Sequence, residues 1–340
     1  MKIDLSLLLG LITVSYVISL VVTRYMTIHH IISDIPNTRS SHKTPTPRAG
    51  GLGIFIVFIF VSIFFWLYNR TVLPIWFYPF VLSTLLIGSH SLFDDISERS
   101  AIEKLLAQVI AAAIVISSGL VIELPFGGPW LNIVVTTLWI VGMTNATNFM
   151  DGLDGLVSGI FSLALVFFCL ILGSTGHYDL YVFSLTLIAG LMGFLIYNFP
   201  PAIIFMGDVG SCLLGFVYSV MVVIMLGDNH SPWVMLASVL VVFNLLFDIG
   251  FTIIRRLLRG DNVMQAHRSH LFQLMNRLGY RHLTVSLCYL GVTFVQGMLA
   301  LWVLRNHTSF VWLIILLLLL IHFVYATLVI SAAKRNKLSL

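Results

Sequence analysis

Long apolar segments alternate with short polar loops along the chain. A helix needs roughly 20 apolar residues to cross the hydrocarbon core of a bilayer, and only helices suit spans of this pattern. The pattern predicts an all-α integral membrane protein, a polytopic bundle of about eleven transmembrane helices. The expected spans are Leu5–Val22, Gly50–Tyr68, Pro74–Phe93, Leu105–Ile122, Leu131–Thr144, Leu156–Gly173, Tyr181–Asn198, Ser211–Gly227, Trp233–Ile254, Thr284–Leu304 and Phe310–Ala332.

Five polar loops separate these spans and hold most of the acidic, basic and histidine residues. They cover residues 33–51, 94–104, 145–155, 198–211 and 255–283. Counting the spans between them places all five on one side of the membrane, and no stretch is polar and long enough to fold separately. Residues 1–340 are therefore expected to form a single membrane-embedded domain.

Composition supports the membrane interpretation. Hydrophobic residues make up 59% of the chain and charged residues 9%, whereas a soluble domain carries roughly 25% charged residues. A water-soluble protein is excluded. Cys169, Cys212 and Cys288 stand singly in apolar runs without a CxxC spacing, so we expect small core residues rather than disulfides or a metal cluster.

Basic residues predict the orientation, because lysine and arginine accumulate in cytoplasmic loops. Fifteen of the 18 basic residues lie on the side of the five loops, and the other side has Lys2, Arg70 and Arg305. An odd number of spans then places the N-terminus outside and the C-terminus in the cytosol. The function is expected on the cytoplasmic face.

Acidic residues gather where the predicted spans meet these loops. They are Asp94, Asp95, Asp151, Asp154, Asp208 and Asp248. Charges at such depths are costly unless they are paired or bind a metal. Any one of them alone could cap a helix near water, but their clustering favours a site.

The spacing of these acids indicates a metal. Asp151 and Asp154 are three residues apart and would share one face of a helix. Asp94 and Asp95 would point about 100° apart, so that one could serve a metal or a nucleophile while a basic partner holds the other. Several hard oxygen ligands without a cysteine favour Mg²⁺ or Mn²⁺ over zinc.

A glycine-rich segment, Gly207–Ser211, surrounds Asp208 at a predicted helix start, where exposed backbone N–H groups can receive phosphate. The first loop adds Arg39, His42, Lys43 and Arg48. Together they indicate a diphosphate site neutralised by Mg²⁺. Positive-inside topology and contact with anionic lipid also account for the basic loop.

The fifth loop contains His267 and His270, with Gln273 at the same spacing. On a helix these residues would form one polar stripe. The histidines could bind a metal as a pair, or contact phosphate or the head-group region.

These strings resemble the bacterial polyprenyl-phosphate N-acetylhexosamine-1-phosphate transferases, which include the MraY and WecA types. The resemblance covers all five loops in order, and the eleven-span layout is similar to the WecA branch. The strings that carry it are Asp34-Ile-Pro-Asn37-x-Arg39-x-x-His42, Asp94-Asp95, Asn145-Ala-x-Asn148-x-x-Asp151-Gly-x-Asp154-Gly, Phe205-Met-Gly-Asp208-x-Gly-Ser211 and Arg268-x-His270-Leu.

The resemblance implies an enzyme of the bacterial inner membrane that transfers a sugar 1-phosphate from a UDP-sugar to undecaprenyl phosphate and releases UMP, with the bilayer around it and no nucleic-acid partner. It implies Mg²⁺ on Asp208, and Asp94 or Asp95 receiving or orienting the lipid phosphate. The nucleotide pocket would be shaped by Asn148, Asp151, Asp154, Asn198, Phe205 and Lys43. His267, Arg268 and His270 would contact the diphosphate or sugar region, with His270 among the catalytic residues.

The chain departs from the family pattern in the fifth loop. Phe272 and Gln273 stand where the WecA-like pattern continues with histidines, and the MraY-type histidine triplet is missing. These differences argue against a UDP-MurNAc-pentapeptide donor. They are typical of enzymes that initiate O-antigen or other surface polysaccharides from UDP-GlcNAc or its 6-deoxy relatives.

Two other function classes share some of these features. A UbiA-like prenyltransferase also uses aspartate-rich motifs and Mg²⁺, but the segments at 34–42 and 207–211 do not suit it. A secondary transporter also buries acids beside helix breaks, but near the membrane midplane, whereas these acids lie at one face.

Overall fold

The computed structural model describes residues 3–34, 45–69, 73–228, 231–262, 267–306 and 310–340. The helices of this described part are α1 (Leu5–His29), α2 (Leu52–Tyr68), α3 (Phe77–Ile96), α4 (Ala101–Ser117), α5 (Pro129–Met150), α6 (Leu156–Thr175), α7 (Tyr178–Asn198), α8 (Asp208–Asp228), α9 (Pro232–Val241), α10 (Phe243–Leu258), α11 (Leu271–Arg277), α12 (His282–Asn306) and α13 (Val311–Arg335). Two short strands, β1 (Ser33–Asp34) and β2 (Thr46–Pro47), complete the elements.

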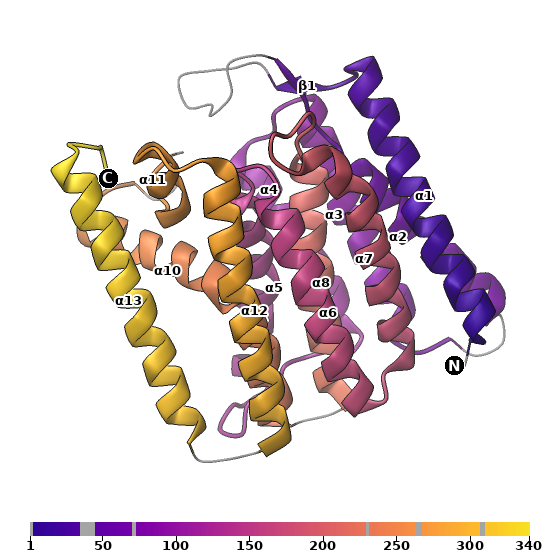
Figure 1. Ribbon diagram of the computed structural model, residues 1–340. Coiled ribbons are helices and arrows are strands. Elements are labelled where there is room, and N and C mark those ends of the chain that lie inside the picture. Colours follow the sequence, from indigo (N-terminus) through magenta and orange to yellow (C-terminus); the bar gives the residue numbers. More distant parts are fainter. Residues whose placement is uncertain (1–2, 35–44, 70–72, 229–230, 263–266, 307–309) are drawn as a thin grey trace.

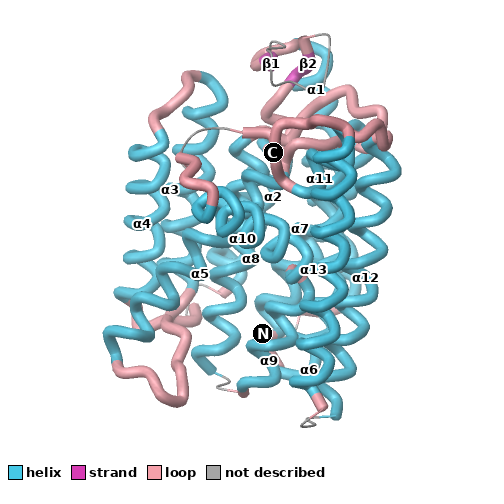
Figure 2. The backbone as a smooth tube through the Cα atoms, turned by 90° about the vertical axis from the view of Figure 1, so that its left-hand side faces the viewer, coloured by secondary structure: helices cyan, strands magenta, loops and turns pink. Residues whose placement is uncertain are grey.

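The long helices stand side by side in one bundle, with the two termini at opposite ends (Figures 1 and 2). Helix α8 is at the centre, and its apolar stretch of 18 residues is entirely buried. A helix that is apolar on every side suits either a protein core or lipid, and α8 occupies the core. By contrast, only 17% of the corresponding apolar stretch of α1 is buried, and 22% of that of α13.

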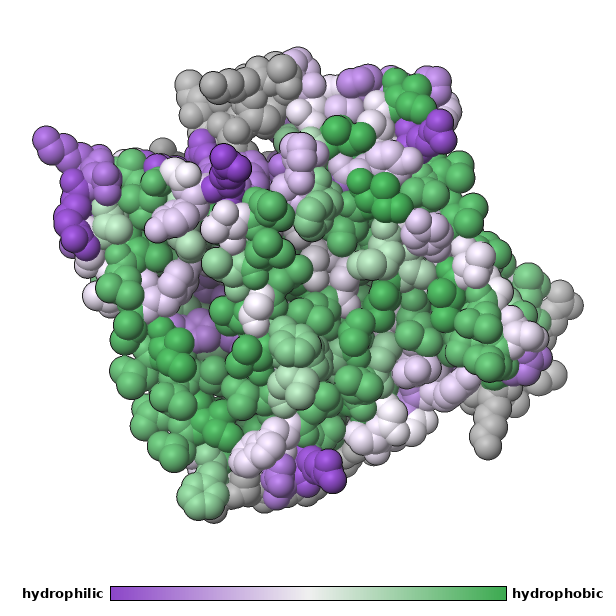
Figure 3. Space-filling model, viewed as in Figure 1, coloured by the Kyte–Doolittle hydropathy of each residue, from purple (hydrophilic) through white to green (hydrophobic). Residues whose placement is uncertain are grey.

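The outer surface of the bundle is suited to lipid. Leucine, isoleucine, valine and phenylalanine side chains of α1, α12 and α13 are exposed in quantity, and Figure 3 shows a broad hydrophobic face between two more polar ends. Seven described helices are long and apolar enough to cross a membrane, or eight if the bent pair α9 and α10 is one span. The prediction of an all-α integral membrane protein is confirmed.

Each of the eleven predicted segments contains a helix, but the helix of the fourth ends at Ser117 and the ninth is not one straight helix. Helices α9 and α10 are bent by 74° on either side of Val242. Polar groups of α12 meet the break. Asn244 N donates to Gln296 Oε1 at 3.2 Å, and Asn244 Nδ2 donates to Thr293 Oγ1 at 2.9 Å. No glycine or proline marks the bend in the sequence, so it depends on these tertiary contacts.

The first and fourth polar loops are joined at one end of the bundle. β1 and β2 pair antiparallel, with Ser33 opposite Pro47. Beyond β2, Phe205 N donates to Pro47 O at 2.8 Å, and Gly50 N donates to Phe205 O at 2.9 Å. A Cβ atom on Gly51 would lie 2.3 Å from Gly210 Cα, so this approach requires glycine. These contacts fix residues 45–51 against the start of α8.

The cysteine prediction is correct for two residues and wrong for the third. Cys169 and Cys212 are buried, whereas Cys288 is exposed on α12. Cys288 lies on an outward face of that helix, beside a groove toward α13. In a membrane protein an apolar run does not distinguish core positions from positions that face lipid, because both are apolar.

Candidate active site

Asp95, at the end of α3, is tied to the start of α8. Its Oδ1 accepts a hydrogen bond from Asp208 N at 3.0 Å, and its Oδ2 accepts one from Val209 N at 2.9 Å. A carboxylate at the first N–H groups of a helix satisfies donors that the helix cannot use and interacts favourably with its dipole. Arg48 donates to the backbone carbonyl of Asp95, and its Nε is 3.8 Å from the carboxylate.

Gly207 makes this approach possible. Its φ is +74°, and a Cβ atom there would lie 2.8 Å from Asp95 Oδ2. An L side chain would be strained in this backbone region and would also displace the carboxylate. The glycine before Asp208 is therefore required by the helix start that places Asp208.

Asp95→Asn is expected to lower stability by about 2–4 kcal/mol, because the amide can accept one of the two hydrogen bonds and its NH₂ group then faces the other donor. Thermal unfolding of the purified protein in detergent measures this as a lower midpoint. Glu98→Gln, at an exposed acid three residues later, is the control and should leave the midpoint unchanged. Equal midpoints for the two variants would show that Asp95 does not hold the start of α8.

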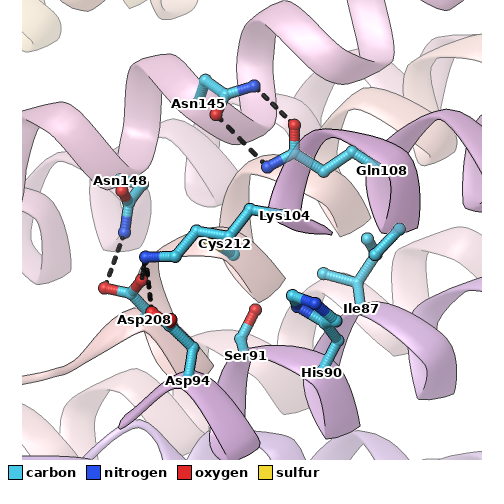
Figure 4. Close-up of a pocket in the computed structure, with 11 residues that line it drawn as sticks. Ile87, His90, Ser91, Asp94, Lys104, Gln108, Asn145, Asn148, Asp208 and Cys212 are labelled. Atoms are coloured by element: carbon cyan, nitrogen blue, oxygen red, sulfur yellow. Dashed lines mark hydrogen bonds and ion pairs between the residues drawn. The ribbon is translucent and has the colours of Figure 1, made fainter. Parts of the chain in front are cut away.

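Lys104 lies between the two remaining carboxylates of this corner (Figure 4). Its Nζ is 2.5 Å from Asp94 Oδ2 and 2.9 Å from Asp208 Oδ2. Asp94 also accepts a hydrogen bond from Arg99 N at 2.6 Å. The ammonium group offsets the repulsion between two carboxylates that the fold brings together.

The sequence motifs do not include Lys104 among the candidate site residues. It belongs to the second polar loop, but it lies on the first turns of α4, ten residues beyond Asp94. The available signal was a lysine, next to Glu103, at the start of a largely apolar helix. The structure shows that this position faces α3 and α8.

Asn148 connects α5 to the same corner. Its Nδ2 donates to Asp208 Oδ1 at 2.9 Å and to Ser211 Oγ at 3.1 Å. A cavity of about 20 Å³ lies beside these groups, with Gln108 and Asn145 hydrogen-bonded to each other on its wall. This volume is sufficient for about one water molecule. Helices α3, α4, α5 and α8 thus converge on Asp208.

Asp151 and Asp154 do not share a helix face, contrary to the spacing argument. Helix α5 ends at Met150 and α6 begins at Leu156, so both acids lie in the connecting turn. Asp151 is half-buried, and this desolvation, followed by the negative charges of Asp208, Asp95 and Asp154, raises its pKa to about 8. Its carboxylate therefore belongs to the electrostatic environment of Asp208.

Asp154 points to the other side of this turn. It lies 3.0 Å from His282 Nδ1 and accepts a hydrogen bond from Ala202 N at 3.1 Å. Burial raises its pKa, but the hydrogen bonds from His282 and Ala202 outweigh that effect and lower it. Asp154 is thus an ionised link between the third loop, the fourth loop and the start of α12.

Asn198 and Phe205 also hold the loops together. Asn198 Oδ1 accepts from Gly155 N at 3.1 Å and Ser158 Oγ at 2.9 Å, and its Nδ2 donates to Ile204 O at 3.0 Å. Phe205 contributes the backbone bonds to Pro47 and Gly50. The side-chain amide of Asn198 is thus hydrogen-bonded to other residues of the protein, whereas the Phe205 side chain is half-buried at the same end.

The fifth loop does not form the predicted helical stripe. Helix α11 begins at Leu271, so His267 and Arg268 precede it and His270 is its N-cap. Gln273 Oε1 accepts from His270 N at 3.3 Å and thereby caps α11. The rings of His267 and His270 are still close, with centroids 4.7 Å apart.

The two histidines have different surroundings. Burial, then electrostatic interaction with His270, Arg256 and Arg255, lowers the pKa of His267 to about 4, so His267 is neutral at pH 7. His270 is buried and stacks with Phe149 of α5 at a centroid distance of 6.2 Å. Arg268 is half-exposed beside them, and its carbonyl accepts from Arg277 Nη1 at 2.8 Å.

The fifth loop contacts the third. A Cβ atom on Gly152 would lie 3.3 Å from the Phe272 ring and 3.6 Å from Gln273 Nε2. The two residues that depart from the family pattern therefore lie against the turn that carries Asp151. Lys43, with Arg39 and His42, falls outside the described residues.

The carboxylates that could hold a divalent cation are Asp208 and Asp151. Within the described ranges, no group of three or more acidic, histidine or cysteine side chains is arranged to hold a metal ion. Mg²⁺ is commonly bound by one or two carboxylates together with substrate phosphates and water. A site that is completed by a substrate phosphate therefore fits these residues.

Comparison with known proteins identifies the same region. Residues 77–226, from α3 to α8, match the model of glycosyl transferase family 4. A probable undecaprenyl-phosphate N-acetylglucosaminyl 1-phosphate transferase of Bacillus subtilis is 32% identical over 298 residues, covering 85% of this chain and 81% of that protein.

Two further relatives extend this similarity. A decaprenyl-phosphate N-acetylglucosaminephosphotransferase of Mycobacterium tuberculosis is 31% identical, covering 76% of this chain and 73% of that protein. A phospho-N-acetylmuramoyl-pentapeptide-transferase of Levilactobacillus brevis is 29% identical, covering 89% of this chain and 99% of that protein. The ordered loop motifs, the acidic corner at Asp208 and these relatives together show that the chain belongs to glycosyl transferase family 4, the MraY- and WecA-like membrane transferases.

Proposed function

We propose that this protein transfers an N-acetylhexosamine 1-phosphate from a UDP-sugar to undecaprenyl phosphate and releases UMP. The observation that carries the proposal is the corner in which Asp208, Asp94, Asn148 and Lys104 converge from four helices. Relatives whose names specify transfer to undecaprenyl or decaprenyl phosphate support the substrate class.

The reaction exchanges one phosphoanhydride bond for another. An oxygen of the lipid phosphate attacks the phosphorus that bears the sugar, the bond to the bridging oxygen breaks, and that oxygen leaves with UMP. A phosphate monoester has a second pKa of about 6, so the nucleophile is already largely dianionic at neutral pH. A general base is not required, and direct attack is the simplest course.

The principal difficulty is bringing two anions together. Lys104 and Arg48 provide positive charge at the corner, and Asn148 holds the orientation of Asp208. Bound Mg²⁺, with Mn²⁺ as the alternative, would neutralise charge on the diphosphate. Desolvation and the nearby charges of Asp208, Asp95 and Asp154 raise the pKa of Asp151 to about 8, and this gathering of acidic groups supports the proposal of a bound cation.

Within this proposal the sequence-derived residues are joined by Lys104, which only the structure identifies. Asp208 and Asp151 would hold the metal, Asp94 and Lys104 would meet the lipid phosphate, and His270 with Arg268 would contact the diphosphate or sugar. Asp95, Asp154 and Asn198 shape the pocket through the helix start and turns that they bind. Lys43 and Phe205 contribute from the first and fourth loops, and His267 acts as a neutral group.

The proposed setting is the bacterial inner membrane, with eleven crossings, the N-terminus outside and the active site on the cytoplasmic face. The 15 basic residues on the loop side support this orientation. We propose UDP-GlcNAc or a 6-deoxy relative as the donor and the first membrane step of an O-antigen or other surface polysaccharide as the role. Family membership disfavours a UbiA-like prenyltransferase and a transporter.

A donor panel tests the function. Membranes containing the protein, with undecaprenyl phosphate, Mg²⁺ and labelled UDP-sugars, are expected to release UMP and form a lipid-linked sugar with at least one N-acetylhexosamine donor. UDP-glucose is the control, because it lacks the acetamido group. Membranes without the protein give the background, and the absence of UMP above that background for every donor would refute the assignment.

A further inference from the structure

A buried acid outside the corner just described is Asp248, on α10. Its side chain is 1% exposed. Oδ1 accepts a hydrogen bond from Leu271 N at 2.9 Å, and Oδ2 accepts from Phe272 N at 3.1 Å and from Tyr289 Oη at 2.5 Å. Each carboxylate oxygen of Asp248 therefore accepts a hydrogen bond from one of the first two N–H groups of α11.

The position of Asp248 depends on the bend between α9 and α10. The 74° change of direction lays α10 beneath α11 instead of continuing along the axis of α9. Asp248 lies one turn beyond Asn244, whose contacts with α12 satisfy the break. The bend thus places an acid at the start of a seven-residue helix that contributes no length to the bundle.

The residue that precedes these two amides is His270. Its Nδ1 lies 3.6 Å from Asp248 Oδ1 and has no hydrogen-bond partner among the described residues. The ring stacks with Phe149 of α5 and with Phe272, with centroid distances of 6.2 and 5.9 Å. Asp248 therefore holds the backbone that follows His270. Its carboxylate is also the polar group that His270 Nδ1 faces.

A carboxylate in this place is costly for the fold. Asp248 lies at the inner end of an apolar groove of about 420 Å³ that opens between α12 and α13, on the face drawn in Figure 3. Isolated charge beside lipid-facing surface is unfavourable and is found where a partner or a function requires it. Tyr289 and Tyr325 line the same groove: Tyr289 Oη donates to Asp248 Oδ2 and lies 3.2 Å from Tyr325 Oη.

We propose that Asp248 is a positioning residue for His270, holding the imidazole toward the substrate side of the fifth loop through the start of α11. The inference rests on the proposed function, in which His270 contacts the diphosphate or sugar. Asp248 itself does not touch the substrate. Through Asp248, the bend between α9 and α10 sets the position of the loop in which this chain departs from its family pattern.

A double-mutant cycle tests the proposal. Asp248→Asn can satisfy only one of the two α11 amides, and is expected to lower kcat by about 10- to 100-fold. In a His270→Gln background the same substitution should change kcat by less than about 3-fold, since an effect that acts through His270 has then already been lost. Equal factors in both backgrounds would overturn the proposal.

A milder variant covers the case in which Asp248→Asn folds poorly. Tyr289→Phe removes one hydrogen bond from Asp248 and leaves both α11 amides bonded. It should lower kcat by about 3- to 10-fold with His270 present and have almost no effect without it. Asp261→Asn, the same chemical change at a more exposed acid of the following loop, is the control and should leave kcat unchanged.

A measurement independent of turnover separates this inference from the proposed function. Hydrogen exchange followed by mass spectrometry should show faster exchange in a peptide spanning residues 270–275 for Asp248→Asn, and no change for Asp261→Asn. Unchanged exchange would overturn the positioning role even in an active enzyme. Faster exchange in Asp248→Asn, together with a wild-type protein that releases no UMP, would instead refute the proposed function and retain the link between Asp248 and α11.

Discussion

Asp208→Asn is expected to abolish sugar-phosphate transfer, with a loss of at least about 1,000-fold in kcat. The substitution removes a negative charge from the corner where Lys104 Nζ and Asn148 Nδ2 both bind the carboxylate. A neutral amide binds a divalent cation far more weakly and leaves Lys104 paired only with Asp94. UMP release in membranes, measured with the most active donor, provides the comparison.

The control for this variant must show that the protein is inserted and folded. Asp261→Asn makes the same chemical change away from the corner and should retain wild-type activity. The thermal midpoint of Asp208→Asn in detergent should remain near that of the wild type, because its backbone N–H stays bonded to Asp95. Substantial activity in Asp208→Asn would exclude this carboxylate as the metal ligand.

Lys104→Gln is expected to cause the second largest loss, about 100- to 1,000-fold in kcat/KM. Without the ammonium group, Asp94 and Asp208 repel each other, and the positive charge proposed to meet the lipid phosphate is missing. The effect should appear at every donor sugar, because Lys104 acts on phosphate. Initial rates at varied undecaprenyl phosphate concentrations measure it.

Lys104→Arg distinguishes charge from shape. The guanidinium keeps the charge but is planar and larger than the ammonium, so we expect partial activity between the values for Lys104→Gln and the wild type. Lys334→Gln, at an exposed lysine of the last turn of α13, removes one charge elsewhere and should have no effect. A Lys104→Gln enzyme with normal kinetics would show that the ion pairs seen here have no part in turnover.

The sequence by itself was sufficient for the class of fold. Spans such as those of α6 and α8 are apolar over their whole length, and hydropathy alone identifies them because a helix in lipid must satisfy its backbone internally. The residues Asp94, Asp208 and Asn148 were also identifiable, since polar groups at the ends of such spans are rare and occur in an ordered set of motifs.

The sequence did not reveal how those groups are paired. Asp151 and Asp154 have the spacing of one helix face, yet a turn sends one toward Asp208 and the other to His282. Their separation depends on where α5 ends and α6 begins, and such boundaries are the least certain part of a pattern. Lys104 and His282 were missed because each acquires a partner from a distant segment.

What the sequence determined is therefore the set of apolar helices and the identity of the polar residues at their ends, because both follow from the cost of exposing polar groups to lipid. Only the tertiary structure decided the bend at Val242, the seating of Asp95 on the start of α8 and the contact of Asp248 with α11. Each of these depends on a donor and an acceptor from segments far apart in the chain, and no local pattern records such a pairing.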